Sequence, residues 1–209
     1  MQPDTEKLIL PKPHLSWSAF SCWLQNPERF KREYFQNGKR LDSKFLQFGK
    51  SIASEIENGT YKERLPNLEV YSEVEFQINT EINGVPILSY LDTYDPERNI
   101  LREFKTGTHR NPWTPAKVYK HGQLVFYAVA LRSLTGKMPE YCHLDWIITD
   151  DSPRSGSVFD RSSKELRLTG HIKSFKRVFD ARELDRMEKD IVRVAHEISN
   201  AYKEFLKDL

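Results

Sequence analysis

Two carboxylates and one ammonium group flank a short turn in the middle of the chain. Asp92 precedes the turn, and Glu103 and Lys105 follow it. The flanking segments are rich in β-branched, aromatic and aliphatic residues, whereas residues 95–99 read Asp-Pro-Glu-Arg-Asn, a composition typical of a turn. The sequence therefore predicts a β-hairpin that carries the three charged groups.

The register of this hairpin decides what chemistry the three groups could do. If residues 96–99 form the loop, Asp92 lies directly opposite Glu103, and Lys105, two residues further on, projects to the same face. Opposed like charges destabilise a sheet, and a divalent cation between them would remove that cost. Carboxylate oxygens suit Mg²⁺ or Mn²⁺, and an ammonium group can hold a water nucleophile or stabilise charge on a phosphate. The alternative interpretation is a surface hairpin with scattered charges.

A mostly buried helix is expected after the hairpin, over residues 113–134. Pro115 suits its first turn, and the apolar residues that follow have helical spacing. Tyr119, Gln123 and Tyr127 are four residues apart and would form one polar stripe on this helix. Buried polar groups have partners. The stripe is therefore either part of a functional site or a Tyr–Gln–Tyr ladder satisfied against the sheet.

Taken in order and spacing, these motifs resemble those of the PD-(D/E)XK nuclease superfamily, and most closely its RecB-type and phage-type exonuclease domains. The resemblance spans about residues 15–148, and its segments are 15–20, 26–31, 48–57, 92, 103–107 and 123–127. It implies a restriction-endonuclease-like α/β fold, with a central mixed β-sheet flanked by helices in the order αβββαβ. Extra helices at the N-terminus and a long C-terminal helix would be added to this core.

The resemblance also implies a role for each motif. Asp92 and Glu103 would bind Mg²⁺ or Mn²⁺, with the Phe104 carbonyl as a further ligand. Lys105 would position the attacking water.

The remaining motifs would contact the substrate. Gln123 and Tyr127 would orient the lysine or bind the scissile phosphate. Further substrate contacts are expected from Ser18, Arg110, Tyr119 and Lys120.

The chain departs from the family pattern in two places. The family's Gly-x-x-x-His is Gly49-x-x-x-Ala53 here, so a histidine metal ligand is missing, and Leu91 stands where the family has proline. Glu57 lies one turn beyond Ala53 on the same helix stripe and is expected to replace the histidine. Glu55, roughly 160° from Ala53 around the helix, is the reserve. The alternative for either glutamate is an ordinary solvated side chain.

The resemblance favours a metal-dependent deoxyribonuclease, most of all an exonuclease that acts on DNA ends in phage or in recombination and repair. A structure-selective or single-strand endonuclease is the alternative of the same class. A catalytically weak nucleic-acid-binding module that kept the fold is an alternative of another class. The expected partner is single- or double-stranded DNA, with a helicase or recombinase as a further partner. The sequence does not indicate an oligomeric state.

Composition agrees with one folded domain. The chain has 209 residues, of which 30% are charged and 38% hydrophobic, and a net charge of +2 that does not by itself indicate nucleic acid. We expect residues 1–13 to be a flexible leader and residues 14–209 to be a single nuclease domain.

The number of cysteines excludes several kinds of site, and the length of the apolar runs excludes a membrane span. Two cysteines are too few for an iron–sulfur cluster, a structural zinc site or a disulfide framework. The first residues do not resemble a signal peptide, and no apolar run reaches the length of a membrane span. A cytoplasmic protein without membrane association is therefore expected.

Overall fold

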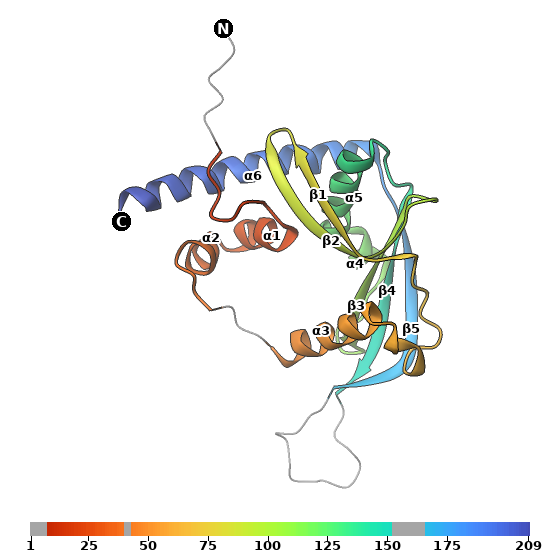
Figure 1. Cartoon of the computed structure of the whole chain (residues 1–209). Coiled ribbons are helices and arrows are strands. Elements are labelled where there is room, and N and C mark those ends of the chain that lie inside the picture. The colour runs from red at the N-terminus through yellow and green to blue at the C-terminus, as the bar shows by residue number, and fades with distance from the viewer. Residues whose placement is uncertain (1–7, 40–42, 152–165) are drawn as a thin grey trace, which may run out of the picture.

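The structure, a computed structural model, describes residues 8–39, 43–151 and 166–209 (Figure 1). Its centre is a five-stranded sheet in which the strands lie in chain order. The strands are β1 Glu73–Ile82, β2 Val85–Asp95, β3 Ile100–Thr108, β4 Tyr141–Asp150 and β5 Arg167–Val178. β3 and β4 are parallel, and all other neighbours are antiparallel. The expected mixed sheet flanked by helices is confirmed.

The helices surround this sheet, with the long C-terminal helix along one side (Figure 1). They are α1 Trp17–Gln25, α2 Pro27–Phe30, a π-helical turn Lys31–Phe35, α3 Lys44–Glu57, a 3-10 turn Thr60–Glu63, α4 Pro115–Tyr119, α5 Gly122–Thr135 and α6 Ala181–Lys207. Ser16 and Ser43 cap α1 and α3, because each hydroxyl accepts a hydrogen bond from the backbone N–H three residues later. Of the helices in the described ranges, none joins enough length to enough apolar character to cross a bilayer.

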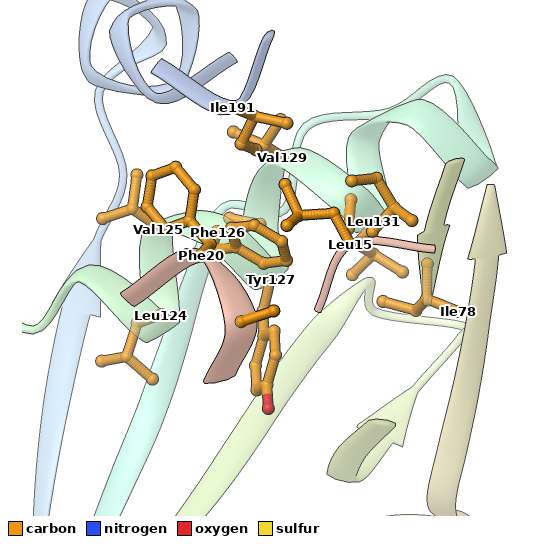
Figure 2. Packing of buried hydrophobic residues seen from close by; sticks show 14 of the residues in the cluster. Leu15, Phe20, Ile78, Leu124, Val125, Phe126, Tyr127, Val129, Leu131 and Ile191 are labelled. Atoms are coloured by element: carbon orange, nitrogen blue, oxygen red, sulfur yellow. The ribbon is translucent and has the colours of Figure 1, made fainter. Parts of the chain in front are cut away.

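Apolar side chains form one cluster on each face of β4. Trp146 belongs to the larger cluster, which also holds most of α5 and the inner face of α6 (Figure 2). Ile147 points to the opposite face, where it packs with Ile52 and Ile56 of α3. Alternate residues of a strand point to opposite faces. A strand covered on both faces therefore buries almost every side chain.

Both hairpins turn at residues whose composition is typical of turns. Asn83 and Gly84 have positive φ angles of 47° and 84°, as a two-residue turn between twisted strands requires. In the second hairpin Thr93 pairs with Arg102, which is the expected register. The ladder between β2 and β3 ends at this pair. Asp92 and Glu103 therefore lie just beyond it, where the two strands separate.

The expected helix over residues 113–134 is wrong in one respect, because it is interrupted between α4 and α5. His121 has extended backbone angles of φ −77° and ψ 98°. Gly122 begins α5 against the ring of Trp17, so close that a Cβ atom there would lie 2.8 Å from the ring. Because Gly122 has no Cβ atom, α1 can pack closely against the start of α5. Since the helix is interrupted, Tyr119 does not share a stripe with Gln123 and Tyr127.

Residues 8–13 of the expected leader lie within the described part of the chain. Leu8 and Leu10 pack against the larger hydrophobic cluster. The Ile9 N–H donates a hydrogen bond of 2.9 Å to Ser199 Oγ on α6. Residues 1–7 of the expected leader lie outside the described residues.

A buried ion pair joins β3 to β4 next to the predicted hairpin. Arg102 and Asp145 have exposed side-chain fractions of only 4% and 1%, and Arg102 Nη1 lies 2.5 Å from Asp145 Oδ2. Arg102 also donates to the Tyr71 hydroxyl at 3.3 Å and pairs with the carboxylate of Glu69. The sequence assigned no role to Asp145, whose partner lies 43 positions away.

We expect Arg102→Met to lower the free energy of unfolding by about 3 kcal/mol, because it leaves the buried Asp145 carboxylate without its counter-ion. Urea denaturation followed by circular dichroism measures this. Arg98→Met is the control, since the Arg98 side chain is 62% exposed to solvent and the loss of its ion pair with Asp95 costs far less. Equal losses in the two variants would contradict the interpretation.

Candidate active site

The candidate site lies where β2 and β3 separate. Asp92 is half-buried, and its Oδ2 accepts a hydrogen bond of 2.6 Å from the backbone N–H of Phe104. This N–H is available because the ladder between the two strands has already ended. Burial raises the pKa of Asp92 well above its ordinary value, and the nearby carboxylate of Glu103 raises it further. The ionised form of Asp92 is therefore unfavourable in the protein alone.

Glu103 and Lys105 form an ion pair on β3. Lys105 Nζ lies 2.5 Å from Glu103 Oε1, and Glu103 is only 2% exposed. Burial acts to lower the pKa of Lys105, but the carboxylates of Glu103 and Asp92 outweigh it, so that the pKa is raised. Lys105 is therefore protonated at neutral pH. Among the described residues, Glu103 Oε2 is buried without a hydrogen-bond partner.

These groups fit a divalent cation. One carboxylate has an unsatisfied buried oxygen, and the other has a raised pKa because negative charge lies beside it. A bound cation would coordinate the unsatisfied oxygen of Glu103 and lower the pKa of Asp92. Carboxylate oxygens are the ligands that Mg²⁺ and Mn²⁺ prefer. Within the described ranges, no three acidic, histidine or cysteine side chains converge as a metal-binding cluster.

The structure does not bring Glu57 or Glu55 to the acidic pair. Glu57 is the exposed last residue of α3, and its charge acts on Glu75 of β1. Glu55 forms an ion pair with Arg64 instead. Ala53, which stands where the family has histidine, lines a cavity of about 300 Å³ together with Asp92.

Gln123 and Tyr127 meet on α5, near the acidic pair. Gln123 Nε2 donates a hydrogen bond of 2.7 Å to the Tyr127 hydroxyl. Figure 2 shows this hydroxyl pointing away from the hydrophobic cluster in which the rest of the helix is packed. Burial raises the pKa of Tyr127, and the carboxylates of Glu103 and Asp92 raise it further, because they are close to the ring. Tyr127 therefore stays neutral.

His121 lies at the start of α5, near Lys105. Burial lowers its pKa to about 4, and the positive charge of Lys105 contributes to that shift. The imidazole is therefore neutral at physiological pH. It packs edge-on against Trp113, with 5.0 Å between the ring centroids.

The four residues expected to contact substrate lie outside this group. Tyr119 is 61% exposed, and its carbonyl accepts a hydrogen bond of 2.9 Å from Arg177. Lys120 and Tyr119 line a different cavity, beside α6. Arg110 lies 3.5 Å from Asp151, and Ser18 is exposed in the first turn of α1 with its hydroxyl 3.0 Å from that of Ser16.

Glu75 of β1 is a member of the site that the sequence analysis missed. It lines the cavity with Asp92 and Lys105 and is half-buried. The hairpin register places it opposite Asp92, because Val74 pairs with Thr93 and the next pair on the other side is Phe76 with Leu91. Asn83-Gly84 is typical of a two-residue hairpin turn, and extending the register of that turn along β1 would have found Glu75.

The fold of this chain matches that of several solved structures, although no protein-family model and no curated protein matches its sequence. The alkaline exonuclease of Laribacter hongkongensis matches with a TM-score of 0.53 at 13% identity, over 93% of this chain and 92% of that one. The same enzyme in complex with dAMP gives a TM-score of 0.52 at 14% identity over the same shares. A candidate exonuclease from Eubacterium rectale gives a TM-score of 0.56 at 14% identity, over 88% of this chain and 82% of that one.

At these identities the likeness is one of fold. The chain has a restriction-endonuclease-like fold, which it shares with the alkaline exonuclease and the candidate exonuclease, as the resemblance in sequence implied. Asp92 lies on β2, and Glu103 and Lys105 lie on β3.

Proposed function

We propose that this protein is a Mg²⁺- or Mn²⁺-dependent deoxyribonuclease that removes nucleotides from DNA ends. The observation that carries the proposal is the arrangement of Asp92 and Glu103, with one unsatisfied buried oxygen, beside a protonated Lys105. Nothing in the packing of the sheet requires two carboxylates at this place. A cation and a phosphate would use all three groups.

Asp92 and Glu103 would hold the cation. When bound, such a cation makes a nearby water more acidic and offsets the negative charge of the phosphate. Lys105 donates hydrogen bonds, and Glu103 Oε1 fixes the direction of its ammonium group. From that place Lys105 orients the water that attacks phosphorus, and the bond to the leaving oxygen breaks as the new bond forms.

Gln123 and Tyr127 would hold the scissile phosphate in place. The tyrosine hydroxyl accepts one hydrogen of the Gln123 amide and so fixes the orientation of that side chain. The second N–H of the amide is then available to a phosphoryl oxygen. Because Tyr127 stays neutral, it adds no negative charge beside the phosphate.

The choice of an exonuclease rests on the solved structures of the same fold. The proteins from Eubacterium rectale and Laribacter hongkongensis are both described as exonucleases. The Laribacter hongkongensis enzyme was also solved with dAMP, a single nucleotide. An endonuclease would use the same groups for hydrolysis. A binding module without activity is the second candidate, and it is favoured by the lack of a converged third metal ligand among the described residues.

The test is digestion of labelled DNA, linear and circular, single- and double-stranded, with Mg²⁺, Mn²⁺ or EDTA. Digestion of linear DNA alone, only with the metal, is the expected result. Cleavage of circular DNA would replace the exonuclease by an endonuclease. DNA binding without cleavage under every metal condition would leave the binding module.

Tyr127→Phe is expected to lower the cleavage rate about tenfold, because Gln123 loses the hydroxyl that orients it. The fold should be retained, since phenylalanine fills the same space. Tyr94→Phe is the control, as its hydroxyl bonds to Asn99 on the turn, away from the carboxylates. Steady-state cleavage of linear DNA compares the three proteins. An unchanged rate in Tyr127→Phe would leave the Gln–Tyr pair as a purely structural ladder.

A further inference from the structure

The backbone of Glu75 is unusual for a residue inside a strand. Its φ angle is 49°, in the left-handed region that side chains other than glycine rarely adopt. Of the four non-glycine residues with positive φ in the described ranges, the other three are asparagines, the residue type that tolerates this region best. Glutamate does not share this tolerance of the left-handed region, so Glu75 is the unusual residue among the four.

This conformation interrupts the ladder between β1 and β2 without shifting its register. Val74 still pairs with Thr93 and Phe76 with Leu91, so no residue is inserted. The interruption redirects a single side chain. Such local distortions of a strand often lie beside active sites, where they aim one residue at the site. Glu75 accordingly lines the cavity with Asp92 and Lys105.

Three carboxylates from three neighbouring strands therefore lie near one another, because the charges of Glu75 on β1 and Glu103 on β3 both act on Asp92 of β2. Burial raises the pKa of Glu75, and the charges of Glu57 and Glu103 raise it further. The protein thus accepts a strained backbone in order to bring a further negative charge to a place that already has two. The unsatisfied buried Oε2 of Glu103 is an independent sign that a ligand belongs there.

We propose that Glu75 is a positioning residue of the divalent-cation site, which accepts hydrogen bonds from the water shell of a cation held by Asp92 and Glu103. It rests on the proposed function and gives Glu75 the place that the sequence analysis assigned to Glu57. Mg²⁺ and Mn²⁺ are bound through few protein carboxylates, and Mg²⁺ keeps several of its waters. Residues that hold such waters or ligands contribute strongly to metal affinity. An outer position also agrees with the lack of a converged three-ligand cluster among the described residues.

Glu75→Gly and Glu75→Gln test this inference in complementary ways. Glycine adopts the left-handed backbone without strain, so the first variant removes the carboxylate and keeps the conformation of β1. Glutamine keeps one acceptor oxygen and removes the charge. Glu73→Gln is the matched control, because it removes one negative charge from an exposed side chain two residues away on the same strand. Asp92→Asn serves as the reference for loss of a direct ligand.

The measurement is the dissociation constant for Mn²⁺ without DNA, from the electron paramagnetic resonance signal of the free ion. Glu75→Gly should bind Mn²⁺ about 10–100-fold more weakly than the wild type, with Glu75→Gln in between and Glu73→Gln unchanged. If both Glu75 variants bind within twofold of the wild type while Asp92→Asn does not bind, the inference is overturned and the proposed function stands. If the wild type itself binds no Mn²⁺, both are overturned.

Discussion

Lys105→Met is expected to lower the rate of DNA cleavage at least about 1,000-fold and to leave binding of Mn²⁺ in place. Methionine has nearly the length of lysine and no charge, so the variant removes the ammonium group with little change in shape. The raised pKa of Lys105 keeps this group charged, and its hydrogen bond to Glu103 fixes where it points. Loss of a preorganised cation at the reacting phosphate acts on the transition state more than on binding.

Single-turnover cleavage of linear DNA measures this rate, and the free Mn²⁺ signal measures metal binding in the same samples. Lys189→Met on α6 is the control, since it also exchanges one ammonium for a thioether but lies on a helix that carries none of the site residues. A Lys105→Met variant that keeps a tenth or more of the activity would show that Lys105 only neutralises Glu103.

The parts of the site that could be predicted are those set by local sequence. The turn over residues 96–99 fixes the register of its own hairpin, and therefore it places Asp92 next to Glu103 and Lys105. The spacing of Gln123 and Tyr127 lies within one helix, and their hydrogen bond follows from helix geometry.

The parts that could not be predicted depend on contacts between distant segments. The start of α5 packs against Trp17, more than a hundred residues earlier, and this contact cannot be read from the residues near Tyr119. The partner of Asp145 is Arg102, on a neighbouring parallel strand whose register no turn specifies.

The third acidic residue of the site also depends on how distant segments pack, which helix periodicity does not report. Helix periodicity puts Glu57 on the stripe of Gly49 and Ala53, but it does not report where that helix ends relative to the sheet. Glu57 is the last residue of α3 and is exposed. Glu75 reaches the site through one left-handed residue in a strand, and this conformation opposes the preference of glutamate. The backbone preference of a residue type therefore predicts the wrong conformation where the site requires another one.

Asp92→Asn should lower cleavage at least about 1,000-fold and, in the absence of metal, raise the free energy of unfolding at neutral pH by about 1 kcal/mol. Burial and the carboxylate of Glu103 raise the pKa of Asp92 above its ordinary value of 3.8, so the native state binds this proton more strongly than the unfolded chain does. The contribution of Asp92 to stability is therefore complete below the unfolded pKa and is lost as the pH rises through the native pKa. Asparagine cannot ionise and can still accept the hydrogen bond from the Phe104 N–H.

The stability of the metal-free wild type should accordingly contain a term that falls as the pH rises from about 4, and this term should be missing in Asp92→Asn. Urea denaturation in EDTA across this pH range isolates it as the difference between the two proteins. Asp95→Asn provides a contrast of opposite sign: the pKa of Asp95 is lowered, mainly by the hydrogen bond from the Arg98 N–H, so its stabilisation is present above pH 4 and is lost as the pH falls. If Asp92→Asn is less stable than the wild type at pH 7 without metal, the carboxylate is a structural group. A gain in stability together with a loss of activity would instead mean that Asp92 is kept at a cost to the fold, which only a bound cation can offset.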